Sequence, residues 1–252
     1  MPAATLEQFK TVSLYSYLGR LYGFVWQPEG LNAMLLMIAD VLTPVQAEDI
    51  RSNLGAMRFE DGKATAGWSA QLVKDNDQAR EGAALSLLRE KVSRAILDHE
   101  VFSLAVRPKA LTPLIFSRYG EGRRYGTHVD NPLMDGLRTD VSFTLFLAEP
   151  ATYDGGELVI ETMAGEEEVK LPAGHLVAYA STSLHRVEPV TRGERLAAVG
   201  WAQSYIRDGA RRELLFDIET TRRNLFAQSG KSPEFDLLSK SSANLFRMWA
   251  ET

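Results

Sequence analysis

Two of the four histidines in the chain stand where they could bind a metal ion. One residue separates His128 from Asp130, and on an extended strand alternate side chains point to the same face. The spacing therefore directs an imidazole and a carboxylate toward one point. His185 lies in another predicted strand and could supply a third ligand, because strands distant in sequence lie side by side in a jelly roll. Two histidines and one carboxylate on one face of an iron ion leave positions open for a bidentate cosubstrate and for oxygen.

The His-x-Asp pattern is weak when taken alone, and an exposed turn pair before Asn131 and Pro132 is the alternative interpretation. The remaining two histidines fit structural roles. His175 is predicted to lie in a turn and not to be a ligand. His99 is predicted at the C-terminal end of a helix, where the helix macrodipole favours a positive charge.

Arg195 follows His185 by ten residues, after a turn-containing stretch at 188–193 that would bring the next strand alongside the first. A guanidinium deep inside a barrel needs an anionic partner, and its geometry matches the two oxygens of a carboxylate. The alternative for Arg195 is a surface cation on a strand, which is how we interpret Arg186 and Arg192. A buried Arg195 would place an anion-binding side chain near the three candidate ligands.

These side chains need a β-sheet core to position them, and the sequence from about residue 110 has the pattern of one. Short strand-like segments are separated by turn residues such as Gly122 and Asp154-Gly155-Gly156. Many short strands with regular turns are typical of a β-sandwich or a jelly roll. The predicted strands are 114–119, 141–147, 157–161, 167–171, 176–180 and 196–205.

Helices are predicted on both sides of this core. Residues 35–42 form a strand or a buried run, and Thr43-Pro44 then marks the start of a helix. A second helix is predicted to start at Asn76 or Asp77, and the C-terminal part of the chain is again helical. The predicted fold class is mainly β with flanking helices. A double-stranded β-helix (jelly roll) forms the core, with N-terminal helices packed on it and a C-terminal helical segment.

The same patterns divide the chain into four parts. They are an N-terminal extension at 1–33, a helical support region at 34–109, the jelly-roll core at 110–205 and a C-terminal helical segment at 206–252. Met34 is a plausible start for the domain, so an over-long gene-start assignment is one interpretation of the extension. We therefore expect a chain that begins at Met34 to fold and to bind metal.

Composition excludes several classes of protein. With 252 residues, 45% hydrophobic and 24% charged, the chain has ordinary globular composition. Its net charge of -5 argues against nonspecific nucleic-acid binding, which needs a large positive surface. Cysteine is absent, which excludes a disulfide, a thiolate nucleophile and a cysteine-ligated metal. Neither a membrane-spanning apolar run nor an export signal is recognisable, so we expect a cytoplasmic protein without membrane or nucleic-acid partners.

As a joint pattern, these residues resemble the iron(II)/2-oxoglutarate dioxygenases of the prolyl-hydroxylase type. The chain is similar in more detail to the bacterial PKHD-type hydroxylases, a family often found beside iron-uptake genes, from about Met34 to near the C-terminus. One departure is His175, which stands where the family pattern has aspartate. The motifs that carry the resemblance are Tyr119, Tyr125-Gly126-Thr127-His128-Val129-Asp130, Tyr153-Asp154-Gly155-Gly156-Glu157-Leu158, Pro172-Ala173-Gly174, Ser183-Leu184-His185 and Arg195.

The resemblance implies an enzyme that hydroxylates a substrate with O2 while 2-oxoglutarate is oxidatively decarboxylated to succinate and CO2. It implies Fe(II) held by His128, Asp130 and His185. It also implies that Arg195 grips the far carboxylate of 2-oxoglutarate and that Tyr119 assists. L-ascorbate (vitamin C) is the reductant that the family often uses. No catalytic residue is needed beyond the metal ligands, because the metal and the keto acid carry the difficult chemistry.

The substrate and the oligomeric state stay open at this point. A peptide side chain, an amino acid and a siderophore-like small molecule all fit the resemblance, as do a role in iron homeostasis and a homo-oligomer. Two other functions use the same three ligands, namely a zinc-dependent hydrolase and a non-catalytic jelly-roll sensor module. The hydrolase would want an acid or base near the open position and would not need Arg195. If Arg195 is not the anchor, Tyr119, Lys170 and Arg138 are the next candidates.

Overall fold

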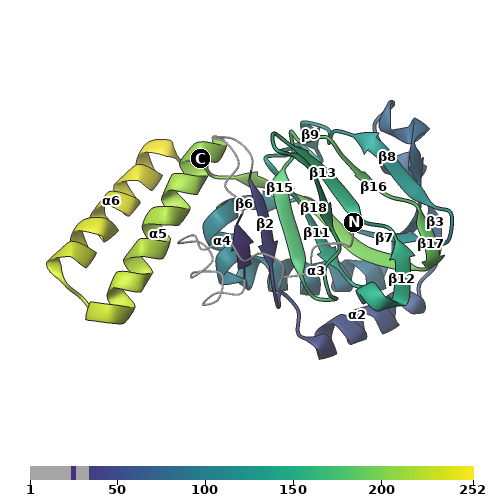
Figure 1. Ribbon diagram of the computed structural model, residues 1–252, viewed down its shortest axis with the longest axis horizontal. Helices are drawn as coiled ribbons and strands as arrows, with labels where there is room; N and C mark the ends of the chain where they lie inside the picture. The colour runs from purple at the N-terminus through teal and green to yellow at the C-terminus, as the bar shows by residue number, and fades with distance from the viewer. Residues whose placement is uncertain (1–23, 27–33) are drawn as a thin grey trace.

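The computed structural model describes residues 24–26 and 34–252 (Figure 1). The predicted extension at 1–33 therefore lies outside the described residues, apart from strand β1 (Phe24–Trp26). This strand pairs in antiparallel fashion with β2 (Leu35–Ile38). Within the residues described, no helix is both long and apolar enough to cross a membrane.

Two antiparallel sheets form the core, and their strand orders identify the predicted jelly roll. The larger sheet runs β1-β2-β15-β11-β18-β7-β5-β3 with β6 beside β18, and the smaller sheet runs β14-β13-β16-β8-β4. The larger sheet also contains β3 (Phe59–Asp61), β5 (Asp77–Ala79), β6 (Pro108–Leu111), β7 (Ile115–Tyr119), β11 (Val141–Phe146), β15 (Leu176–Ala180) and β18 (Arg195–Ser204). The smaller sheet contains β4 (Lys74–Asp75), β8 (Arg124–His128), β13 (Leu158–Thr162), β14 (Gly165–Val169) and β16 (His185–Val187).

Three helices cover the outer face of the larger sheet. Helix α2 (Pro44–Gly55) starts as predicted, with a capping box between Thr43 and Gln46. Helix α3 (Ala83–Asp98) is followed directly by the short helix α4 (Glu100–Val106), which the sequence analysis does not predict. The buried face of α3 has the predicted residues Leu85, Leu88, Val92 and Ile96.

Alternation along the strands decides what each face of the larger sheet contacts. In β11, Phe143 packs on the helix side, edge-on to Phe102 of α4 with ring centroids 5.4 Å apart. Phe146 points to the other face and packs with Leu158 of the smaller sheet. The sheet therefore has one face for the helical core and one face that borders the space between the sheets.

The predicted helix start at Asn76 or Asp77 is wrong. Residues 77–79 form β5, which pairs with β3 and β7, and the helix begins only at Ala83. Asn76-Asp77 has the residue types of a helix cap, yet the pairing of Gln78 with Ser117 holds this segment as a strand. The actual start follows Gly82, which makes no side-chain cap, so no local signal marks it.

The predicted strands of the core are confirmed with shifts of one or two residues. The larger shift is at β14, which starts at Gly165 because a two-residue turn joins it to β13. Several short strands escape prediction because they are polar or contain glycine. They are β9 (Leu133–Met134), β10 (Leu137–Arg138), β12 (Tyr153–Gly155) and β17 (Val190–Gly193). Single turns of 3-10 helix occur at η1 (Gly62–Thr65), η2 (Ala70–Leu72) and η3 (Pro150–Thr152).

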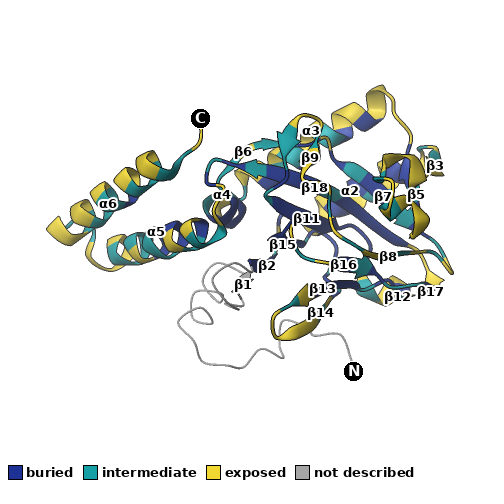
Figure 2. Ribbon diagram, turned by 90° about the horizontal axis from the view of Figure 1, so that it is seen from above, coloured by how far each residue is buried: buried dark blue, intermediate teal, exposed yellow. Residues whose placement is uncertain are grey.

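The C-terminal segment is helical, as predicted. Helices α5 (Gly209–Ser229) and α6 (Pro233–Trp249) form a hairpin that extends away from the sheets (Figure 1). Asp208 and Ser232 cap their N-terminal ends. Figure 2 shows more exposed residues on this hairpin than on the central strands of the larger sheet.

His99 ends α3 as predicted, and it also precedes α4. Its expected positive charge is not supported. The ring is half-buried, and this burial lowers the pKa of His99 from its ordinary value. Burial is the largest influence on this pKa, and the backbone of Ala39 and the charge of Asp40 oppose it.

Candidate metal centre

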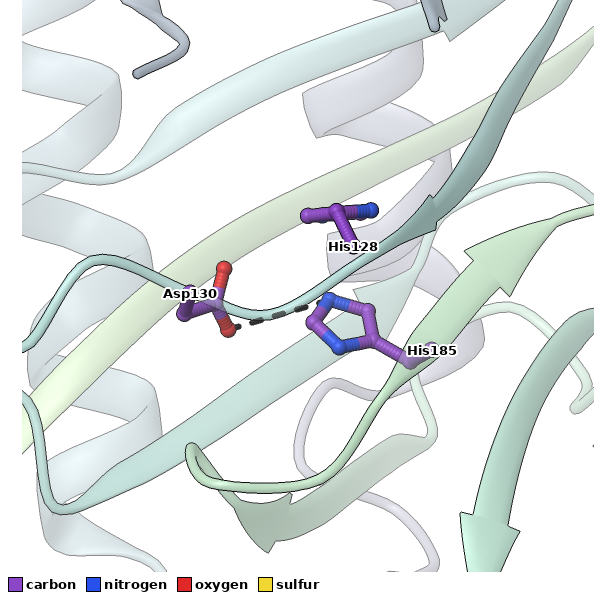
Figure 3. A group of neighbouring side chains, drawn as sticks. All are labelled: His128, Asp130 and His185. Carbon is purple, nitrogen blue, oxygen red and sulfur yellow. Dashed lines mark ion pairs between the residues drawn. The ribbon is translucent and has the colours of Figure 1, made fainter. Parts of the chain in front are cut away.

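The three predicted ligands meet in the space between the two sheets. His128 is the last residue of β8, and His185 is the first residue of β16. The two are direct cross-strand partners, and Asp130 lies just beyond the end of β8 (Figure 3). One ligand atom from each residue lies within 4.8 Å of the others. The jelly-roll pairing thus brings together side chains that are far apart in sequence.

Hydrogen bonds fix the orientation of both imidazole rings. Nδ1 of His128 is 2.9 Å from the carbonyl oxygen of Gly126, and Nδ1 of His185 is 3.1 Å from that of Ser183. Because a carbonyl can only accept, each Nδ1 carries the proton and each Nε2 keeps a lone pair. Backbone acceptors of this kind are the usual supports of metal-binding histidines.

The carboxylate of Asp130 is also held in place. Its Oδ2 accepts a hydrogen bond from the Ser142 hydroxyl at 2.6 Å and lies 3.7 Å from Nε2 of His185. The Ser142 hydroxyl lies in turn 2.8 Å from the hydroxyl oxygen of Ser181. Two supported imidazoles and one supported carboxylate form a donor set that fits a divalent iron ion.

The environment of the rings keeps His128 neutral. Burial, assisted by the neighbouring His185, lowers the pKa of His128 to about 4. A metal ligand must be deprotonated, so this ring is ready to bind near neutral pH. Tyr125 stacks on His128 with ring centroids 3.7 Å apart, and Tyr179 meets His185 edge-on at 5.1 Å.

Arg195 is buried, and this excludes the surface-cation alternative. It begins β18 opposite Tyr119 of β7 and is 1% exposed. Its guanidinium carbon lies 5.3 Å from the ring centroids of both Tyr119 and Phe146. Its Nε has no hydrogen-bond partner, and no described carboxylate lies within ion-pair distance of the guanidinium. Arg195 therefore has donors to offer to an anion.

Gly156 allows the backbone to approach Arg195 closely. Its φ of +68° favours glycine, and an added Cβ would lie 3.1 Å from Cδ of Arg195 and 3.0 Å from Cγ2 of Val190. Packing against Arg195 therefore favours glycine at position 156 of the Gly155-Gly156 motif.

The other residues considered for the site have different partners. The ammonium of Lys170 donates to the carbonyl oxygen of Gly155 at 2.8 Å and pairs with Glu157. Arg138 is bound by the carboxylates of Asp140 and Glu251. Neither residue lines the cavity that contains the three ligands.

Arg186 and Arg192 are also outside the cavity, as predicted. The carboxylates of Glu166 and Glu188 bind Arg186, and that of Asp154 binds Arg192.

His175 lies apart from the three candidate ligands. It does not line the cavity, and its Nε2 lies 3.7 Å from Oδ1 of Asp40. Its amide donates to the carbonyl oxygen of Pro172 at 3.1 Å. The turn therefore keeps a backbone hydrogen bond although the usual aspartate is replaced.

The ligands and Arg195 line one cavity, together with residues that were not predicted from the sequence. Lys74 and Trp201 are the most notable of these. Trp201 could have been found, since an even spacing from Arg195 along one strand places both on the same face. Lys74 stands in a polar stretch that gives no such signal. Burial lowers the pKa of Lys74 to about 8.

Known proteins are similar to this chain. The sequence model of the 2OG-Fe(II) oxygenase superfamily matches residues 114–203. A PKHD-type hydroxylase of Picosynechococcus sp. is 56% identical over 219 residues, which cover 86% of this chain and 100% of the relative. A PKHD-type hydroxylase of Acaryochloris marina is 54% identical with the same coverage. Among solved structures, a 2OG-Fe(II) oxygenase family oxidoreductase from Burkholderia pseudomallei has a TM-score of 0.50 at 16% identity, covering 77% of this chain and 91% of that one, which supports the fold alone.

Proposed function

The chain belongs to the PKHD-type hydroxylases of the 2OG-Fe(II) oxygenase superfamily and is a 2-oxoglutarate-dependent dioxygenase, and from this premise we propose the role of each site residue. His128, Asp130 and His185 hold the Fe(II) that the family uses. Arg195 binds the far carboxylate of 2-oxoglutarate, and Tyr119 assists it. When bound, Fe(II) and 2-oxoglutarate supply the oxidising chemistry that hydroxylates a C–H group and yields succinate and CO2.

The observation that carries the metal assignment is the cross-strand pair of His128 and His185. Their Nδ1 protons bond to backbone carbonyls and leave both Nε2 atoms for a metal, beside the carboxylate of Asp130. Sheet pairing fixes the spacing between the two rings, and Ser142 fixes the carboxylate. The protein thus orients its ligands before any metal arrives.

The assignment of Arg195 is supported by its burial without an anionic partner. A buried, unpaired guanidinium is costly, and a carboxylate that meets it gains charge-assisted hydrogen bonds. The aromatic rings of Tyr119 and Phe146 exclude water from its faces, which strengthens such a contact. The protein's part in the reaction is to bind, orient and desolvate, and no general base is required of it.

Further features of the enzyme are proposed from the family and from the sequence. L-ascorbate acts as reductant, O2 is the oxidant, and the protein works in the cytoplasm on a small-molecule or peptide substrate without nucleic-acid or membrane partners. The zinc hydrolase is disfavoured because a buried, unpaired Arg195 has no use there. The sensor module is disfavoured because the relatives are hydroxylases.

The test is titration of the anaerobic protein with Fe(II) and then with 2-oxoglutarate. We expect one iron per chain and a weak visible charge-transfer band that appears with the cosubstrate. Succinate should form when O2 is admitted. A wild-type protein that binds Fe(II) at another site, or that shows no band with saturating 2-oxoglutarate, would overturn the assignment.

A further inference from the structure

Lys74 is a buried cation whose binding capacity is mostly unused. It lies in β4, is 6% exposed and lines the same cavity as the three ligands. Its ammonium donates one hydrogen bond, to Oγ1 of Thr65 at 2.8 Å. No described carboxylate lies within 4.0 Å of it, although Asp130 and Asp61 are close enough to influence its charge. An ammonium has three donors, so two remain for a ligand.

The position of Lys74 follows from its strand pairing. Lys74 is the cross-strand partner of Tyr125, and its Nζ lies 5.2 Å from the centroid of that ring. Tyr125 in turn stacks on His128. The ammonium therefore lies beside the metal-binding histidines with a single aromatic ring between them.

Lys74 is the first of three buried polar side chains at alternate positions. Lys74, Asn76 and Gln78 are buried and line the cavity, whereas Asp75 is exposed and Asp77 is half-buried. The segment crosses from β4 in the smaller sheet to β5 in the larger one.

The acidic side chains of this segment have partners outside the cavity. The carboxylate of Asp77 binds Arg118 and Arg123, and Asp75 lies within ion-pair distance of Arg123. The segment therefore contributes an ammonium and two amide side chains to the cavity lining, and no carboxylate.

Trp201 provides a second, independent donor. It is 8% exposed, lines the cavity and leaves its indole N–H without an acceptor among the described residues. Buried donors are normally satisfied, so an unpaired one at a cavity wall indicates a ligand or water acceptor. Both features select for a molecule that is rich in acceptor atoms.

Charge balance distinguishes Lys74 from Arg195, if the proposed function holds. Fe(II) and Asp130 together leave one positive charge, and Arg195 adds a second. The dianion 2-oxoglutarate neutralises both. Lys74 is then left as an uncompensated cation in the cavity lining, and such a charge is costly unless a further anion binds.

Arg195 and Trp201 mark two separate ends of the cavity along β18. Arg195 and Trp201 are six positions apart on this strand, which corresponds to about 20 Å. A carboxylate held by Arg195 therefore lies far from the Trp201 end.

We propose that Lys74 is the substrate-binding residue of this hydroxylase and that the substrate carries a carboxylate, which the Lys74 ammonium binds inside the cavity. Trp201 offers its N–H to a further acceptor on the same substrate. The proposal rests on the proposed function and adds a substrate class to it. Free amino acids are the simplest molecules with this chemistry, and their carboxamides have the same shape without the charge.

The experiment uses the anaerobic full-length protein loaded with Fe(II) and 2-oxoglutarate. Free L-amino acids and their carboxamides are added as matched pairs. The readouts are the perturbation of the charge-transfer band, which reports binding, and succinate formation after O2 is admitted. We expect at least one acid to perturb the band with an affinity at least about tenfold above that of its amide, because the amide lacks the charge that pairs with Lys74.

Variants then assign the discrimination to Lys74. Lys74→Met should weaken binding of the acid at least about tenfold and leave 2-oxoglutarate affinity unchanged. Lys74→Arg should restore part of the preference for the acid because it restores the charge. Lys63→Met is the matched control, since Lys63 is exposed on the same segment, outside the cavity, and its loss changes the net charge equally. Thermal melting of each variant identifies loss of folding.

Four outcomes would overturn the proposal. They are equal binding of acids and amides, no response to any acid, unchanged acid binding in Lys74→Met, and weaker 2-oxoglutarate binding in Lys74→Met, which would make Lys74 a cosubstrate anchor. If Lys74→Met does not fold, the acid preference of Lys74→Arg decides, and its complete loss would also count against the proposal. In each case the wild-type band still forms with Fe(II) and 2-oxoglutarate. Failure of the proposed function would instead abolish that band.

Discussion

Arg195 and Lys74 are two buried cations on the wall of one cavity, and the fold supports them very differently. Arg195 begins a long strand with a partner on either side, and its guanidinium lies between two aromatic rings. Lys74 lies in a two-residue strand at the edge of the smaller sheet, and its ammonium donates a hydrogen bond to the exposed Thr65. The Arg195 side of the cavity is therefore formed by a central strand of the larger sheet, and the Lys74 side is formed by a segment that connects the two sheets.

This difference matches the two ligands that we assign. A cosubstrate shared by a whole superfamily can be bound by elements that define the fold. A substrate that differs between enzymes is better bound by connecting segments, which tolerate sequence change on a fixed scaffold. The segment from η1 to β5 has this character, because it carries exposed apolar side chains such as Trp68 and Leu72 close to buried polar ones.

The largest effect is expected from Asp130→Ala. This change removes a proposed metal ligand, and both the cosubstrate at Arg195 and the substrate at Lys74 need the metal for turnover. Removing even an outer-shell partner typically costs about 10- to 100-fold in metal affinity, so loss of a ligand should exceed that and abolish turnover. Iron content and succinate formation are the measurements, and melting should show an intact fold. Asp98→Ala, at an exposed helix end, is the control. Retained turnover in Asp130→Ala would show that Asp130 is not a required metal ligand.

Arg195→Met should weaken 2-oxoglutarate binding and leave the Lys74 side of the cavity unchanged. Losing a buried partner of a carboxylate typically costs about 2–5 kcal/mol, which corresponds to roughly 30-fold or more in 2-oxoglutarate affinity. Fe(II) binding should change little, and Arg195→Lys should recover only part, because an ammonium cannot form the bidentate contact. Titration of the anaerobic iron complex measures this, with Arg192→Met as the surface control. Equal affinity in wild type and Arg195→Met would assign the cosubstrate to another anchor.

Gly156→Ala should weaken 2-oxoglutarate binding at Arg195 less than Arg195→Met does. Positive φ in a non-glycine residue costs about 1–3 kcal/mol of stability, and the new Cβ would press on Arg195. We expect that loss in the unfolding free energy and a several-fold weaker 2-oxoglutarate affinity. Gly136→Ala is the matched control, because Gly136 has a φ of +76° with nothing within 4 Å of an added Cβ. If both variants lose affinity equally, the contact with Arg195 is irrelevant.

The smallest effect is expected from removing residues 1–33. The described part of this stretch is β1, which pairs only with β2 and is separated by it from the cavity-lining strand β15. A chain that begins at Met34 should therefore fold, bind Fe(II) and lose less than about 2 kcal/mol of stability, the level at which a named structural mechanism is needed. Melting and iron content test this. Aggregation of the shortened chain would show that β1 belongs to the essential core.

The sequence by itself indicated the candidate ligands and the candidate anchor. Alternation at the end of a strand relates His128 to Asp130, and Arg195 follows His185 after a turn between two strands. This pattern is weak when taken alone, and the resemblance to the hydroxylase family was needed to give each residue a role. The main strands of the core were also visible, because β-branched and aromatic residues are enriched in segments such as Val141–Phe146, in which every residue is buried.

Only the tertiary structure decided the other side of the cavity. Asn76-Asp77 has the residue types of a helix cap, and pairing of Gln78 with Ser117 makes the segment a strand instead. Lys74 stands among polar residues, where a lysine is normally exposed. Its burial arises from pairing with Tyr125, a contact between segments about fifty residues apart. Such long-range pairing overrides local preference because it depends on partners that no local window contains.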